Sequence, residues 1–183
     1  MASLCRVALV FVTLCSCLGC QIGTSTIEGD DAISVRTSDG LLRNPRLQAI
    51  VDLQVDRDAL GLAETLFATD PALRARAAFA LGSIQEPTTF SILASRLQSE
   101  EDAAVRRDIV FAIGQLNNES AVPVLVEVLT RETQRDVRYR ILEALGKIGA
   151  VSASEALLSA DVLTDEEPLR VFALAVNGAV FNV

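Results

Sequence analysis

A 32-residue repeat is the feature that most constrains the fold of this chain, and its period is the distance from Gly82 to Gly114. Its most regular members are one glycine and one arginine per unit, namely Gly82, Gly114, Gly146 and Gly178, and Arg74, Arg106, Arg138 and Arg170. Around each glycine, apolar residues recur at spacings of three and four, which predicts a helix with one apolar face. Self-similarity at a fixed period of this length is typical of stacked repeats. We therefore expect an all-α fold, an α-solenoid of antiparallel helix pairs without β-sheet.

Each unit also contains a first helix that precedes the glycine-bearing second helix. Thr88, Ser120 and Ser152 are residue types preferred at helix N-caps, and they recur with the same period as the glycines. Asp70 and Asp102 are candidate caps for the second helix. The glycines fall in the last turn of the second helix, where we expect them to allow neighbouring helices to pack closely. The joining segments are short and mostly polar, as in antiparallel helix pairs.

Two stretches carry a resemblance to a known repeat. They are Val105-Arg106 with Ala112-Ile113-Gly114, and Val137-Arg138 with Ala144-Leu145-Gly146. This pattern resembles HEAT repeats, especially the short bacterial kind named after phycobilin lyases. The resemblance covers residues 41–183, which we divide into a degenerate N-terminal repeat plus four repeats; Leu47 to Leu53 has the spacing of the degenerate second helix. It implies a scaffold that binds other molecules, and it names no partner.

Composition disfavours several functional classes. The chain has 16 basic and 24 acidic residues, a net charge of −8, which argues against a nucleic-acid partner. It contains no histidine, the commonest general base and metal ligand. All four cysteines lie at or before Cys20, so the repeats cannot contain a zinc–cysteine site or a disulfide. We therefore expect a protein that is not an enzyme and that uses no cofactor and no metal.

The segment 1–20 has the layout of an export signal, with one positive charge at Arg6 followed by an apolar run. Its end, Leu14 to Cys20, resembles the lipobox of bacterial lipoproteins, in which the chain is cut before a cysteine that then carries lipid. Cys20, preceded by Gly19, is the expected lipidation site, and Cys17 is the alternative. An ordinary cleaved signal peptide with incidental cysteines is the other interpretation.

The next segment, residues 21–40, is rich in Gly, Ser, Thr and Asp, which is typical of a flexible tether. By the same resemblance, Gln21 rather than Asp after Cys20 favours the outer membrane. We therefore expect the protein in the bacterial cell envelope, held by a lipid anchor and facing the periplasm.

Side chains of the second helices that avoid the apolar face are expected to line the concave side of the solenoid. They are Arg76, Phe79, Arg107, Asp108, Phe111, Tyr139, Arg140, Glu143 and Lys147. Arginine and aromatic residues are enriched at binding hot spots, so we treat this set as the candidate partner-binding surface. A second interpretation places Phe79 and Phe111 in the core beneath the next repeat.

The arginines in register also have two interpretations. They can bind an acidic partner, or they can stabilise the stack by pairing within or between repeats, and we favour the structural role. Candidate partners for that role are Asp70, Asp102, Asp136 and Glu166. The carboxylate clusters at 100–102 and 165–167 precede second helices, where negative charge favours a helix N-terminus, and we do not expect catalysis from them.

These observations favour a lipid-anchored envelope adaptor or scaffold that binds a protein partner. A chromophore (phycobilin) lyase-like subunit or maturation factor is the alternative that the resemblance suggests. The absence of histidine, and of cysteine in the repeats, argues against it. A purely structural envelope component is a third hypothesis.

Overall fold

The computed structural model describes residues 44–178. The predicted export signal, Cys20 and Cys17, the tether at 21–40, and the two ends of the repeat domain lie outside the described residues. Within residues 44–178 the structure has α-helices, one short 3-10 turn and no strand, so the all-α prediction is confirmed. The helices are α2 (Pro45–Val55), α3 (Ala59–Thr65), α4 (Pro71–Ile84), α5 (Phe90–Ser99), α6 (Ala103–Gln115), α7 (Ala121–Arg131), α8 (Arg135–Ile148), α9 (Val151–Ser159) and α10 (Glu167–Val176).

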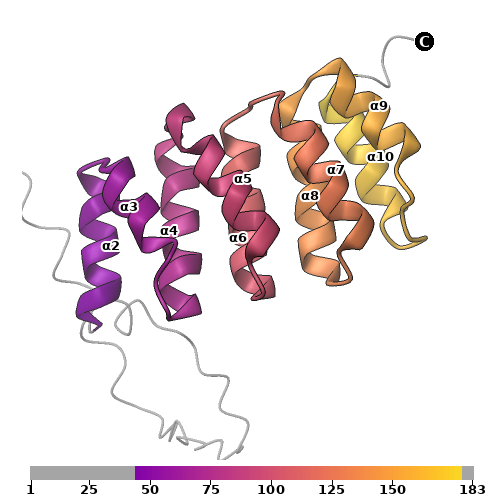
Figure 1. Cartoon of the computed structure of the whole chain (residues 1–183). Helices are drawn as coiled ribbons and strands as arrows, with labels where there is room; N and C mark the ends of the chain where they lie inside the picture. Colours follow the sequence, from indigo (N-terminus) through magenta and orange to yellow (C-terminus); the bar gives the residue numbers. More distant parts are fainter. Residues whose placement is uncertain (1–43, 179–183) are drawn as a thin grey trace, which may run out of the picture. The chain divides into compact units, whose positions relative to one another are not determined.

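The helices form two layers, as the predicted antiparallel pairs require (Figure 1). The second helices α4, α6, α8 and α10 pack side by side in one row, and α2 extends this row by packing on α4. The first helices α3, α5, α7 and α9 form the other layer. Helix α2 covers Leu47 to Leu53, the residues that were interpreted as a degenerate second helix. Between the layers lie the predicted apolar residues of α4, since Leu73, Leu81 and Ile84 are all buried.

The second helices begin where the sequence predicts. The side chains of Asp70 and Asp102 accept hydrogen bonds from the N–H groups of Ala72 and Val105, at 2.9 and 3.0 Å. Such bonds satisfy N–H groups that the helix itself leaves free. Both predicted caps are therefore confirmed.

The first helices begin differently. Ser120 precedes α7 but makes no capping bond with its side chain, and Ser152 lies inside α9. Thr88 lies in the 3-10 turn Pro87–Thr89, which precedes α5. Ser120 is therefore the N-cap residue of α7 by position only, and the cap role of Thr88 and Ser152 was wrong. Glu86 and Asn118 accept instead, from the N–H groups two residues later, because the chain turns before the helix starts.

The glycines in register set the distance between second helices. A Cβ atom on Gly82 would lie 2.9 Å from Ala112 Cα, and one on Gly114 would lie 2.9 Å from Ala144 Cβ. No real Cβ tolerates such a distance without displacing its neighbour. The predicted role in close helix packing is confirmed for these glycines and for Gly146.

The last repeat departs from the 32-residue register. In the described chain, Gly178 has no heavy atom within 4 Å of its Cβ position and adopts a φ of +78°, so it follows the end of α10 and does not pack, contrary to the prediction. Gly146 meets Ala173, whereas the register of the Gly82–Ala112 contact would put Val176 there. Helix α10 is thus displaced by three positions, about one helical turn.

Candidate interaction surface

Three of the four arginines in register join consecutive repeats. Arg74 donates from Nε and Nη2 to the two carboxylate oxygens of Glu100, both at 2.8 Å. Arg106 holds Glu132 in the same way, at 2.7 and 3.0 Å. The third pair, Arg138 with Glu166, has distances of 2.6 and 2.9 Å. Such bidentate pairs are the strongest arginine–carboxylate contacts.

These contacts confirm the structural role of the arginines and correct most of their expected partners. Glu166 was among the predicted partners and does pair. Asp70 and Asp102 instead cap helices, and Asp136 is exposed in the first turn of α8. The actual partner comes from the following repeat, 26 residues on in the first two pairs and 28 in the third.

The Arg74–Glu100 pair shows how these side chains are occupied by contacts within the protein. Glu100 also accepts hydrogen bonds from Arg96 at 2.6 Å and from the N–H of Asp102 at 2.9 Å. Burial alone would raise the pKa of Glu100, but the hydrogen bonds from Arg74, Asp102 and Arg96 outweigh it and lower the pKa to about 2. The Nη1 atom of Arg74 donates to the carbonyls of Ala68 and Thr69. Both side chains are therefore fully engaged within the protein.

Two phenylalanines form a partly exposed pair on the row of second helices. Phe79 of α4 and Phe111 of α6 stack with their ring centroids 5.2 Å apart and their planes 9° apart. This is a favourable arrangement for aromatic rings. Phe79 remains 44% exposed, so its interpretation as a core residue was wrong. The pair is a surface feature, as the binding interpretation requires.

Cations surround this aromatic pair. The guanidinium of Arg76 lies 5.5 Å from the centroid of Phe79, and Arg140 and Lys147 lie 5.6 and 5.7 Å from that of Phe111. These distances allow cation–π attraction. We name Arg76, Phe79, Phe111, Arg140 and Lys147 the aromatic–cation cluster.

One carboxylate accompanies the cluster in the described part of the chain. Glu143 binds Arg140 at 2.6 Å and Lys147 at 2.8 Å. Burial would raise the pKa of Glu143, and the two cations outweigh burial and lower it.

Arg76 differs from the other cations, because no carboxylate of residues 44–178 pairs with it. Its Nη2 donates to the neutral amide of Gln54 at 2.6 Å, and its Nη1 is screened from solvent and makes no hydrogen bond to the described residues. Desolvation therefore lowers the pKa of Arg76.

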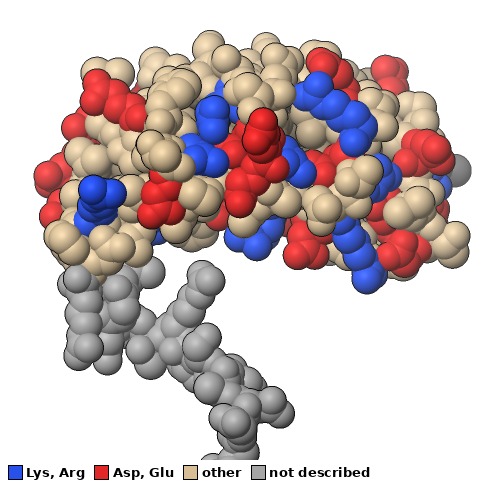
Figure 2. Space-filling view, turned by 60° about the horizontal axis from the view of Figure 1, so that its bottom comes forward, with Lys and Arg blue, Asp and Glu red and all other residues tan. Residues whose placement is uncertain are grey.

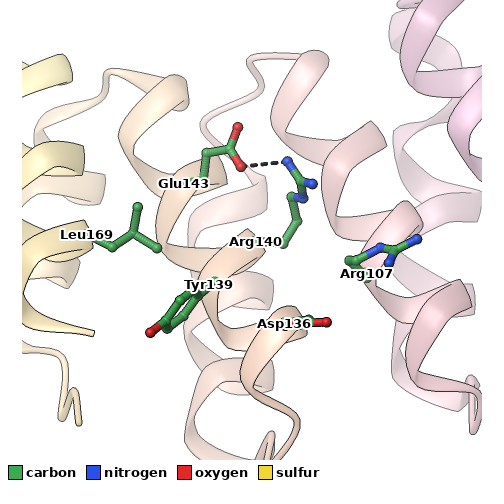
Figure 3. A pocket seen from close by; sticks show the side chains of 6 residues that line it. All are labelled: Arg107, Asp136, Tyr139, Arg140, Glu143 and Leu169. Carbon is green, nitrogen blue, oxygen red and sulfur yellow. Dashed lines mark hydrogen bonds and ion pairs between the residues drawn. The ribbon is translucent and has the colours of Figure 1, made fainter. Parts of the chain in front are cut away.

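Beside the cluster lies an open hollow of about 380 Å³ (Figure 3). It is lined by Arg107, Asp136, Tyr139, Arg140, Glu143 and Leu169. Arg107 pairs with Asp108 at 2.9 Å. The hydroxyl of Tyr139 donates to the carbonyl of Asp165 at 3.1 Å, which ties α8 to the segment before α10. The predicted residues are thus brought together on one surface across α4, α6 and α8.

The charge on this surface is more mixed than the sequence suggested. Arg107 is offset by Asp108, and Arg140 and Lys147 share Glu143. The face in Figure 2 likewise shows basic and acidic side chains interspersed. Three residues of the surface were missed, and no motif marks them in the sequence, since only the packing of neighbouring helices brings them there. They are Gln54, Asp136 and Leu169.

A second hollow, of about 590 Å³, lies among residues of α7, α8, α9 and the segments after α7 and α9. Its lining is partly apolar, with Val126, Leu129, Ala156 and Leu163. No sequence pattern pointed to it. The described residues contain no group of three or more His, Cys, Asp or Glu side chains that could hold a metal ion. None of the helices in residues 44–178 is long and apolar enough to cross a membrane.

Stacked helix pairs with a continuous row of second helices define the class of protein: an α-solenoid, whose extended surface serves to bind other molecules. Comparison with family models identifies the repeats. Residues 91–176 match the model of HEAT repeats, and residues 73–99 match that of the PBS lyase HEAT-like repeat. Residues 73–176 of the chain therefore consist of HEAT repeats. No match was found among curated proteins.

Proposed function

We propose that this protein is a non-enzymatic adaptor that binds a protein partner through the side chains of α4, α6 and α8. HEAT repeats suggest a protein-interaction scaffold. The single observation that carries the assignment to this surface is the stacked pair Phe79–Phe111. A ring that is 44% exposed, with cations held over the pair, has no role in the core. Aromatic and arginine side chains are the usual anchors of protein interfaces.

Reversing two charges on this surface tests the proposal. We expect Arg107→Glu combined with Arg140→Glu to weaken partner binding by about 3 kcal/mol or more, because repulsion adds to the lost contacts. Folding should be nearly unchanged, since such partly exposed ion pairs contribute about 0–1 kcal/mol each. The measurement is crosslinking and recovery of the partner from intact membranes, alongside a thermal melt.

The control reverses arginines away from this surface. Arg46 of α2 is exposed, and Arg131 of α7 forms an exposed ion pair with Glu127. Arg46→Glu with Arg131→Glu changes the net charge equally and should leave the crosslink intact. If the crosslink survives the Arg107 and Arg140 reversals as well, the partner binds elsewhere and the proposed surface is wrong.

The adaptor is further proposed to be lipid-anchored in the bacterial envelope, at the outer membrane facing the periplasm. This rests on the resemblance of Leu14 to Cys20 to a lipobox. Several acyl chains, at about 0.8 kcal/mol per buried CH₂, would form a firm anchor. We expect Cys20→Ser to release the protein from membranes or to leave the precursor uncut, as followed by membrane fractionation and mass spectrometry. Loss of the lipid in Cys17→Ser but not in Cys20→Ser would make Cys17 the anchor.

A chromophore lyase-like subunit remains the second candidate, because residues 73–99 match the PBS lyase HEAT-like repeat. The pigment content of the source cell discriminates between the two. A cell without phycobiliproteins has no substrate for such a subunit.

A further inference from the structure

The aromatic–cation cluster indicates the chemistry of the partner, an inference that rests on the proposed function. We propose that the cluster binds a segment of the partner in which an aspartate or glutamate lies next to an apolar residue. The carboxylate would lie among Arg76, Arg140 and Lys147, and the apolar side chain would cover the exposed ring of Phe79.

The charge balance around the rings argues for a carboxylate. Three cations lie 5.5, 5.6 and 5.7 Å from the ring centroids of the pair. Among the described residues, Glu143 is the one carboxylate that binds any of them. Two positive charges are therefore left without a matching negative charge, in a chain whose net charge is −8. An acidic group from outside is therefore favoured here.

Arg76 gives the binding position for that carboxylate. Its side chain is partly buried, and within residues 44–178 its hydrogen-bonding partner is the neutral Gln54 while its Nη1 atom makes no hydrogen bond. Burial without an opposite charge disfavours the charged form, which is why the pKa of Arg76 is lowered. A carboxylate that reached this guanidinium would supply the missing charge and a charge-assisted hydrogen bond.

The rings argue for an apolar neighbour. Phe79 lies at the open end of the stack, since Phe111 has Arg140 and Lys147 over it whereas Phe79, in the described structure, has Arg76 alone. An exposed ring gains from contact with an aliphatic or aromatic side chain. The cations that need a carboxylate and the ring that needs an apolar contact belong to one cluster. Two adjacent residues of one peptide segment, one acidic and one apolar, can therefore bind both.

Peptide selection on the full chain tests this inference. The probe is a phage library of random 12-residue peptides, selected on the immobilised protein and counter-selected on Arg76→Gln combined with Lys147→Gln. We expect enrichment of Asp or Glu beside aliphatic or aromatic residues. In a synthetic version of the selected peptide, exchanging the acid for its amide should weaken binding about tenfold, with steep dependence on salt.

The variants decide whether the cluster is responsible. Against Lys147→Gln, which changes an exposed side chain, the acid and amide peptides should differ less than against the wild type. This single variant keeps the test valid if the Arg76 change impairs folding. Arg46→Gln with Arg131→Gln removes two charges elsewhere and should leave the tenfold difference unchanged.

Three outcomes would overturn the inference. Selected peptides that lack acidic residues, yet lose binding with Arg107→Glu and Arg140→Glu, would refute the acidic class and leave the proposed surface standing. Acidic peptides indifferent to Arg76→Gln and Lys147→Gln would place their site away from the cluster. Failure to select any peptide would refute the recognition of a short segment. The proposed function would still be tested separately, by the crosslinking of the partner described above.

Discussion

Glu100→Ala is expected to lower the free energy of unfolding by about 3–5 kcal/mol, because it leaves buried charges without their partner. The carboxylate of Glu100 is fully buried and accepts hydrogen bonds from Arg74, Arg96 and the N–H of Asp102. Removing it breaks the link between two repeats and leaves the guanidinium groups of Arg74 and Arg96 without their carboxylate. Urea denaturation followed by circular dichroism measures the loss.

The neighbouring glutamate provides the control. Glu101 is exposed, and Glu101→Ala removes the same charge, so we expect a change within about 0.5 kcal/mol. If both substitutions lowered the free energy of unfolding equally, the buried ion pairs of Glu100 would add nothing to stability beyond the effect of one negative charge.

The same link predicts how stability depends on pH. The pKa of Glu100 is about 2 in the folded chain, against an ordinary value of 4.5. A carboxyl group with a lowered pKa stabilises the fold above its unfolded pKa, and this contribution is lost as the pH falls through the folded pKa. Unfolding free energy should therefore drop between about pH 4.5 and pH 2. The drop should be smaller in Glu100→Ala but not absent, since the pKa values of Glu132 and Glu166 are also lowered.

Gly82→Val should destabilise the fold by about 3 kcal/mol, because it forces α4 and α6 apart. Even a Cβ atom at this position would lie 2.9 Å from both Ala112 Cα and the ring of Phe111. The backbone of α6 cannot yield as a flexible side chain would. The displacement should also separate Phe79 from Phe111 and so weaken any ligand of the aromatic–cation cluster. Chemical denaturation and peptide binding measure the two effects.

Ser83 is the matched control for that substitution. It is the next residue of the same helix and is exposed, so Ser83→Val introduces the same β-branched side chain without a clash. We expect a change within about 0.5 kcal/mol. A similar loss in both variants would assign the effect to helix propensity instead of packing.

The 32-residue period was enough to predict the two helix layers and the close contacts between second helices. Each glycine occupies the same position in its own repeat, so the contact recurs from Gly82 to Gly146. The period was not enough for the last repeat. The segment before α10 puts its acidic residue at Glu166, 28 residues after Arg138, and α10 is displaced by three positions. Spacing along the chain does not record such a displacement, since Arg170 and Gly178 remain in sequence register.

The candidate surface was predicted from residue type and helical position, and the structure brings its members together. What the sequence could not show was which charges neutralise each other. Arg107 and Arg140 were expected to supply positive charge, and each pairs with a carboxylate, Asp108 at 2.9 Å and Glu143 at 2.6 Å. Arg76 stands out only when its surroundings are known, because the neutral Gln54 comes from a helix outside the regular period.

The links between repeats have a consequence for the history of the chain. Arg74 and Glu100 are separated by 26 residues within a 32-residue period, and Arg106 and Glu132 by the same distance. If one whole period of this region were duplicated, every arginine would again find a glutamate at the same separation, wherever the copy began. A duplication of another length would change the number of residues between these arginines and their glutamates. The third pair, Arg138 with Glu166, accommodates 28 residues, but there the following helix α10 is displaced by three positions. Growth of the array by whole units therefore preserves both the ion pairs and the packing of the second helices.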